Sequence, residues 1–279
     1  MKITEVRLYS SNNTLVSTFS FRDPGSQNPY IAKEILGLDA EEIVPRFYGI
    51  SQVSKSRYYA MSLNSRQIVI NVSLNPEFAV NQTYSDLRDN LYRAISASRT
   101  GEMMIKFFNG DEEVADIGAF LVKMESPHFT DTPEVHITLV CDDPMLHAPM
   151  PVVFTSGINP RSIPEDVSTA PHGFSFKVKF TALTNSFYIR DAATPEWAFT
   201  VTPGTIGGAT GFRVDDELYF SSEQPKQIYL VRAGVTTQLA DKIQLGSIWP
   251  VLFPGDNDFD YSPEVTWELV SYYPTFWGI

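Results

Sequence analysis

The sequence predicts a mainly β protein built from two domains. Short runs in which apolar and polar residues alternate recur along the 279 residues, and this period of two is typical of half-buried strands. An aromatic content of 13%, with 19 prolines and 16 glycines, favours short strands separated by many turns. A proline-rich interval separates two such halves.

The first half opens with strands. Leu15, Phe19 and Phe21 share one face of the first alternating run. Residues 66–74 follow the same rule, with apolar side chains at every even position from 68 to 74. Both runs are therefore predicted to be strands with one face toward a core.

One helix is predicted, over residues 84–98. Apolar residues recur at every fourth position from Leu87 to Ile95, which gives one buried stripe. Thr83 or Ser85 can cap the start.

Strands resume after the helix, at 103–108, 119–124 and 135–141. The Asn-Gly-Asp sequence at 109–111 is typical of a hairpin turn between the first two of these strands.

The proline-rich interval covers residues 142–171 and contains six prolines. Proline interrupts regular structure, so we expect the domain boundary near residue 150. The predicted domains are 1–149 and 150–279.

The second half is predicted to be a β-sandwich. Phe174, Phe176, Val178 and Phe180 alternate with polar residues. Short strands at regular spacing, with turn signals between them and no helix pattern, favour this architecture. Further predicted strands are 186–191, 197–202, 211–214, 217–221, 226–232 and 264–272.

The charge and the termini exclude several classes of protein. The net charge is −12, and no run of basic residues could grip a phosphate backbone. The N-terminal residues lack the apolar core of a signal peptide, and no apolar run reaches the roughly 18 residues of a membrane span. With one cysteine, an intrachain disulfide is impossible. We expect synthesis in the cytoplasm and no membrane insertion.

The stretch LFPGDNDFD, residues 252–260, is the most suggestive acidic cluster. Its aspartates at 256, 258 and 260 fit the first three ligand positions of an EF-hand loop. Tyr261 and Trp267 stand where that loop needs glycine and a bidentate glutamate. The preferred interpretation is a Pro-Gly turn before a strand that begins at Phe259, and an irregular calcium site is the alternative.

Other chemical motifs are incomplete. The glycine-rich stretch 204–211 lacks the lysine of a phosphate loop. His136 and Cys141 are separated by an odd number and point to opposite faces of a strand, so they do not form a zinc pair. No G-x-S-x-G motif is present. We therefore predict no enzyme activity, no catalytic or metal-binding residue and no cofactor. A hydrolase with a spatial triad stays open.

The tryptophans offer a binding hypothesis. Trp197, Trp249 and Trp277 are candidates for contact with a glycan or a protein partner, because flat rings stack on sugar faces. Such rings more often fill a core or an interface.

Several segments, taken in order, resemble a known family. In the first half they are ILGL at 35–38, RQIVI at 66–70, the helix with Leu87 and Leu91, and TLVCDDP at 138–144. In the second half they are DDELYF at 215–220, LFPGDN at 252–257, VTWEL at 265–269 and the ending WGI at 277–279. This order is similar to that of the distal tail proteins of long-tailed, siphophage-type bacteriophages. More acidic residues than usual follow the LFPGDN turn.

The resemblance implies both fold and function. The first domain would be a split β-barrel of the tail-tube type with one flanking helix, and the second a galectin-like β-sandwich. Six copies would form a ring at the distal end of the virion tail, with a channel through which DNA passes. The ring would join the tail-tube protein to the tail-associated hub protein and provide a platform for receptor-binding proteins. The alternative is a carbohydrate-binding module, in which the sandwich holds glycans of the host surface.

Residues 37–65 are long for a connection inside a compact domain. We expect this segment to form an extended arm or hairpin that reaches the adjacent subunit. The candidate contact residues are Val44, Arg46, Phe47, Tyr48, Arg57, Tyr58 and Tyr59.

Overall fold

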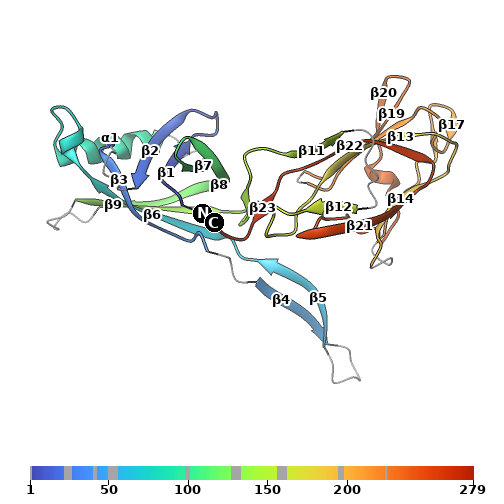
Figure 1. Cartoon of the computed structure of the whole chain (residues 1–279), viewed down its shortest axis with the longest axis horizontal. Helices are drawn as coiled ribbons and strands as arrows, with labels where there is room; N and C mark the ends of the chain where they lie inside the picture. The colour runs from blue at the N-terminus through green and yellow to red at the C-terminus, as the bar shows by residue number, and fades with distance from the viewer. Residues whose placement is uncertain are drawn as a thin grey trace. The chain divides into compact units, whose positions relative to one another are not determined.

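The structure is a computed structural model of the chain (Figure 1). It describes all residues except 1, 22–26, 40–42, 50–55, 98–100, 127–132, 156–161, 194–197 and 224, and of 43–49, 56–63 and 97 it describes the backbone. The chain divides into two compact units. Unit 1 contains Met1–Pro149 and Phe276–Ile279, and unit 2 contains Met150–Thr275. The four C-terminal residues thus return to unit 1.

Unit 1 is built around a nine-stranded sheet. Its strands are β1 (Glu5–Tyr9), β2 (Leu15–Phe21), β3 (Tyr30–Leu36), β6 (Arg66–Leu74), β7 (Met103–Asn109), β8 (Glu112–Glu125), β9 (Glu134–Cys141), β10 (Leu146–His147) and β23 (Thr275–Phe276). The order is β23-β10-β8-β7-β1-β2-β3-β6-β9, and a further pairing of β8 with β9 closes seven strands into a barrel. The β2–β3 pair is parallel. Closure leaves no free edge on the seven barrel strands.

Side chains alternate in direction along the barrel strands, and the apolar ones that point inward fill the barrel. Ile68, Ile70 and Val72 of β6 are fully buried, and the residues between them are part-exposed. Facing strands contribute to the same core cluster. The predicted strands at 66–74, 103–108 and 135–141 are confirmed, and the predicted strand at 119–124 is the second part of the longer β8.

The predicted helix is α1 (Tyr84–Ala97), which follows the 3-10 turn η1 (Pro76–Phe78). Thr83 Oγ1 accepts a bond from the Asp86 N–H at 3.3 Å, and Asp86 Oδ2 accepts from the Thr83 N–H at 2.8 Å. This reciprocal cap satisfies amides at the helix start. The apolar stripe of the helix is buried in the barrel core at Leu87, Leu91 and Ile95.

The predicted arm is a β-hairpin. Strands β4 (Ile43–Gly49) and β5 (Ser56–Leu63) form their own two-stranded antiparallel sheet. The register runs from Ile43 opposite Leu63 to Gly49 opposite Ser56, with a shift between Arg46 and Phe47. In the part of the chain that the structure describes, these strands pair with each other alone.

Unit 2 contains two larger sheets and one small hairpin. The six-stranded sheet has the order β11-β22-β13-β18-β19-β20, and the four-stranded sheet has the order β12-β21-β14-β15. The strands are β11 (Val152–Thr155), β12 (Ser162–Glu165), β13 (Ser175–Phe180), β14 (Phe187–Asp191), β15 (Ala198–Val201), β16 (Thr205–Ile206), β17 (Ala209–Thr210), β18 (Glu217–Ser221), β19 (Gln227–Arg232), β20 (Val235–Gln238), β21 (Gly255–Tyr261) and β22 (Val265–Tyr272). A 3-10 turn, η2 (Ala240–Lys242), follows β20.

The two larger sheets of unit 2 share one aromatic core. Phe176 of β13 and Phe187 of β14 come from different sheets, and their ring centroids are 5.9 Å apart. The ring centroid of Phe174, next to β13, lies 5.5 Å from that of Phe259 in β21. Tilted aromatic contacts of this kind add to the stabilisation that comes from burial of apolar surface. The arrangement is a sandwich, so the predicted mainly β fold, with a barrel, one helix and a second β unit, is confirmed.

Some predicted boundaries differ from the structure. Residues 211–214 do not form a strand: β17 ends at Thr210, and Gly211 adopts a φ of 73°, which turns the chain. Strand β21 begins at Gly255 rather than at Phe259, so the acidic stretch itself is strand. The glycine-rich connection 204–211 is the hairpin β16–β17, with Gly207 and Gly208 at positive φ.

Candidate functional site

A buried arginine organises the root of the β4–β5 hairpin, which is the region where the hairpin joins the barrel. Arg66, the first residue of β6, has no exposed surface. Its Nε donates to Pro144 O at 2.6 Å, and its Nη1 donates to Gly37 O at 2.8 Å and to Asp39 O at 3.1 Å. Its Nη2 donates to the carbonyl of Trp277. One guanidinium therefore ties both ends of the hairpin to the C-terminal residues.

Close backbone contacts reinforce this root. Gly37 has a φ of 86°, and a Cβ there would lie 1.9 Å from the Gln67 carbonyl oxygen. Glycine is therefore required for conformation and for space. The Ile279 N–H donates to Leu38 O at 3.2 Å. The hairpin is thus attached to a closely packed part of the barrel.

The backbone register locates the predicted contact residues on the hairpin. Phe47 lies opposite Tyr58, and Tyr48 lies opposite Arg57. Val44 and Arg46 belong to β4, and Tyr59 belongs to β5. Their contacts with another subunit stay a prediction.

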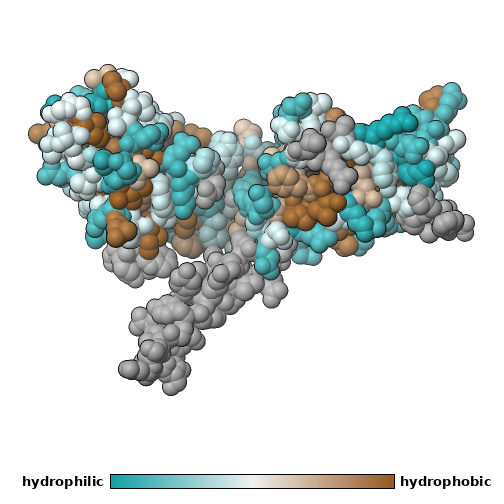
Figure 2. Space-filling view, turned by 180° about the vertical axis from the view of Figure 1, so that it is seen from behind, coloured by the Kyte–Doolittle hydropathy of each residue, from teal (hydrophilic) through white to brown (hydrophobic). Residues whose placement is uncertain are grey.

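Unit 1 also carries an apolar strip outside the barrel, defined here as Leu36, Val69, Phe120, Val122 and Val140. Leu36 pairs with Val69 across β3–β6, and Phe120 pairs with Val140 across β8–β9. Leu36, Phe120 and Val122 are 48%, 42% and 53% exposed. The strand residues on either side of Val69 and of Val140 are buried in the core. Exposed apolar groups that adjoin one another favour a protein contact. Figure 2 shows that apolar residues gather in groups on the face in view.

The acidic stretch 252–260 is a stabilised turn and strand. The buried Asn257 accepts the Phe253 N–H at 2.7 Å and donates to Phe253 O at 2.8 Å and to Gly255 O at 2.9 Å. The three aspartates of the stretch are exposed, and Asp260 forms an ion pair with Arg190 at 3.1 Å. Within the described ranges, no group of three His, Cys, Asp or Glu residues is arranged to hold a metal.

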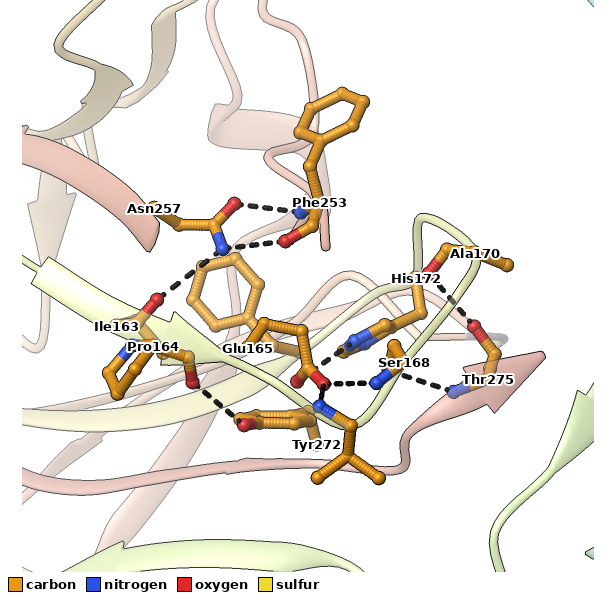
Figure 3. A network of polar contacts seen from close by, with 12 residues as sticks. Ile163, Pro164, Glu165, Ser168, Ala170, His172, Phe253, Asn257, Tyr272 and Thr275 are labelled. Atoms are coloured by element: carbon orange, nitrogen blue, oxygen red, sulfur yellow. Dashed lines mark hydrogen bonds and ion pairs between the residues drawn. The ribbon is translucent and has the colours of Figure 1, made fainter. Parts of the chain in front are cut away.

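Unit 2 contains a buried Glu–His pair (Figure 3). Glu165 Oε2 lies 3.4 Å from His172 Nε2, and the two side chains are 0% and 4% exposed. Glu165 Oε1 accepts the backbone N–H groups of Val167 and Ser168 at 3.1 and 2.7 Å. Tyr272, whose hydroxyl donates to Pro164 O at 3.1 Å, covers the pair.

The surroundings of Glu165 lower the pKa of its carboxyl group. Burial alone would raise this pKa, but the hydrogen bonds from Ser168, together with the nearby Tyr272 hydroxyl and His172, outweigh the effect of burial. Burial and the Glu165 carboxylate raise the pKa of Tyr272. Because both members of the pair are closed to solvent, the pair is suited to holding the loop 165–172, and a substrate could not reach it.

Of the three predicted tryptophans the structure describes two, and these belong to different units. Trp249 is half-buried in unit 2, with ring centroids 4.8 Å from Phe199 and 5.1 Å from Phe220. Trp277 is half-buried in unit 1, at the hairpin root. Trp197 lies outside the described residues. A role of these rings in binding stays a prediction.

Two further sequence interpretations concern β9. Cys141 is fully buried, and His136 is half-buried with its Nδ1 2.5 Å from Asn71 Oδ1. The two side chains differ in environment, as expected for residues on opposite faces of a strand. Among the described residues, no helix has the length and apolar character needed to cross a membrane.

Neither the role of Arg66 as a buried anchor nor the apolar strip was predicted from the sequence. The alternation in 66–74 does place Arg66 on the inward face, and that is the one signal for its burial. The strip is made by strand pairs separated by up to 33 residues, which local patterns do not encode.

Comparisons with known proteins identify the fold. No protein-family model matches the sequence, and no curated protein matches it. The structure is similar to that of the Dit protein of phage SPP1, described as a paradigm of the hub adsorption apparatus in phages that infect Gram-positive bacteria. The TM-score is 0.61 at 13% identity, over 97% of this chain and 99% of that chain. Chains of the phage P2 baseplate in its activated conformation match with TM-scores of 0.44 with Ca and 0.41 with Sr, each at 7% identity and over at least 97% of both chains.

Proposed function

We propose that this chain, which has the fold of the SPP1 Dit protein, is a structural protein of a phage tail tip. Six copies form a ring that joins the tail tube to the baseplate hub and supports receptor-binding proteins. The observation that carries the proposal is the likeness in fold to the SPP1 Dit protein, which covers 97% of this chain and so includes both units. A structural role is proposed in preference to an enzymatic one.

Unit 1 is proposed to form the ring. The seven barrel strands have no free edge with which to extend a sheet, so we expect ring contacts from side-chain surfaces and from elements added to the barrel. The apolar strip supplies a surface of the first kind, and the β4–β5 hairpin supplies an element of the second kind. The fixed root at Arg66 and Gly37 would hold the hairpin in an orientation suited to a neighbour.

The acidic composition suits a channel through which DNA passes. The net charge is −12, and DNA carries one negative charge per about 1.7 Å of axis. Carboxylates on the inner surface of the ring would repel DNA and prevent adhesion. A ring structure whose lumen has a strongly positive potential would contradict this part of the proposal.

The oligomeric state tests the ring. In size-exclusion chromatography with light scattering, we expect a mass of about 188 kDa, six times the 31.3 kDa of one chain. A stable monomer at high concentration, both alone and when mixed with the tail-tube and hub proteins, would overturn the proposal.

Two variants separate the proposed contacts. Deletion of residues 45–62 should give a folded chain that no longer assembles. Phe120→Asp places a charge on the apolar strip and should also prevent assembly. Leu245→Asp, at a fully exposed position of unit 2, is the control and should assemble normally. A deletion variant that still forms complete rings would refute the role of the hairpin.

A further inference from the structure

The six-stranded sheet of unit 2 carries a hollow on its surface. The hollow has a volume of about 320 Å³, which lies within the range of small-ligand sites. Three neighbouring strands, β13, β18 and β19, supply most of its lining. The side chains that the argument uses are Ser175, Lys177, Tyr219, Ser221, Glu223 and Gln227, with Tyr229 beside them.

Strand register assembles these residues in two parallel rows. In one row, Lys177 pairs with Tyr219, and Tyr219 pairs with Tyr229. In the next row, Ser175 pairs with Ser221, and Ser221 pairs with Gln227. The first row supplies aromatic carbon, and the second supplies hydroxyl and amide groups. The hollow therefore offers apolar and hydrogen-bonding surface side by side.

The aromatic row is held in place. The rings of Tyr219 and Tyr229 stack with centroids 4.8 Å apart at 11°. The Lys177 ammonium lies 5.3 Å from the centroid of Tyr219 and forms ion pairs with Glu268 at 2.7 Å and Glu217 at 3.0 Å. The bond to Glu268 is the main reason why the pKa of Lys177 is raised. The lysine thus stays charged and engaged with protein groups.

The polar row presents an excess of acceptors. Ser175 Oγ donates to Ser221 Oγ at 2.9 Å and also lies 3.3 Å from Glu223 Oε2. Gln227 is exposed. Glu223 lines the hollow, and Lys177, which also lines it, is neutralised by its ion pairs with Glu217 and Glu268. A ligand that donates hydrogen bonds and has no negative charge suits this surface, and an anion does not.

We propose that this hollow binds a neutral glycan. The ring C–H groups of a pyranose pack against aromatic carbon, and its hydroxyl groups donate to carboxylate and hydroxyl oxygens. The negative surroundings select against phosphate-bearing or sialylated polymers. The proposal goes beyond the tail-tip role and places glycan contact at a tyrosine pair that the sequence did not single out.

The test uses the full-length chain and a defined set of probes. Neutral oligosaccharides built from glucose, galactose or N-acetylglucosamine, and their phosphorylated or sialylated counterparts, are compared on a glycan array and then by calorimetry. We expect binding of at least one neutral oligosaccharide and at least tenfold weaker binding of its anionic counterpart. Tyr229→Ala should weaken binding about tenfold or more, and Gln227→Ala should weaken it several-fold.

Matched controls identify the site. Gln238→Ala removes an exposed glutamine that pairs with Tyr229 from β20 and does not line the hollow. Tyr273→Ala removes a tyrosine that is 44% exposed elsewhere in unit 2. Both should bind as the parent does. Absence of binding to every neutral probe, a preference for anionic glycans, or equal binding by the Gln227→Ala variant and the parent would overturn the proposal. The ring test does not depend on any of these results.

Discussion

The buried Arg66 allows a quantitative test of the hairpin root. Replacement by methionine keeps much of the apolar volume but removes the guanidinium, so four carbonyl groups lose their donor: those of Gly37, Asp39, Pro144 and Trp277. At about 1 kcal/mol for each buried group left unsatisfied, the loss is about 4 kcal/mol. Removal of a buried charge offsets part of this loss. We expect the variant to be about 3 kcal/mol less stable at the root.

Hydrogen exchange measured by mass spectrometry reports on this region directly. The Ile279 amide, which donates to Leu38 O, should exchange about 100-fold faster in the variant, because every 1.4 kcal/mol corresponds to a factor of ten. Lys123→Met is the control, since Lys123 is 57% exposed and its ion pair with Glu125 lies at the surface. It should change stability by less than about 0.5 kcal/mol. Unchanged exchange at 37–39 and 279 in Arg66→Met would refute the anchoring role.

Three further substitutions test other features. Glu165→Gln should make the stability of unit 2 depend less on pH. The pKa of Glu165 is lowered in the folded state. The carboxylate therefore contributes to stability above its ordinary pKa of 4.5, and this contribution is lost as the pH falls through the lowered pKa. Thermal melts from pH 7 to pH 3 should therefore converge for the parent and the variant, and parallel curves would argue against this. Gly37→Ala should lower the free energy of unfolding by at least about 3 kcal/mol. Gly204 also has a positive φ but has open space around it, so Gly204→Ala should lower it by about 1 kcal/mol. Equal losses for the two variants in urea unfolding would exclude the clash with Gln67. Asn257→Ala leaves buried backbone groups at the turn unsatisfied and should destabilise unit 2 by about 2 kcal/mol, while the exposed Asp256→Ala should be nearly neutral by the same melts.

Local periodicity predicted the elements that bury one face against a single core. The strand at 66–74 and the helix near 84–98 have this property, and both are found within a residue or so of their predicted bounds. Strand β3 was missed because its register shifts between Ala32 and Glu34, which interrupts the alternation. Strand β21 was partly missed because its polar residues suggest a turn, although Asn257 is buried and hydrogen-bonded within it.

Features that depend on distant pairing could not be predicted in the same way. The bond from Arg66 to Trp277 spans 211 positions, and the tyrosine pair forms because Tyr219 and Tyr229 occupy the same row of adjacent strands. Each tyrosine lies in a predicted strand, but the sequence does not state which residues face each other. In the acidic stretch, residue spacing argued against an EF-hand, but it did not predict that the strand begins at Gly255.

The return of the last four residues to unit 1 affects the order in which the chain can fold. Phe276 and Ile279 pack against the barrel core, and they are synthesised after all of unit 2. Domains generally fold as units during synthesis, yet here the earlier unit lacks part of its packing until the later one has been made. The translating ribosome would thus carry an almost finished barrel whose hairpin root is secured last, which would delay any assembly that depends on the hairpin until the sandwich is complete.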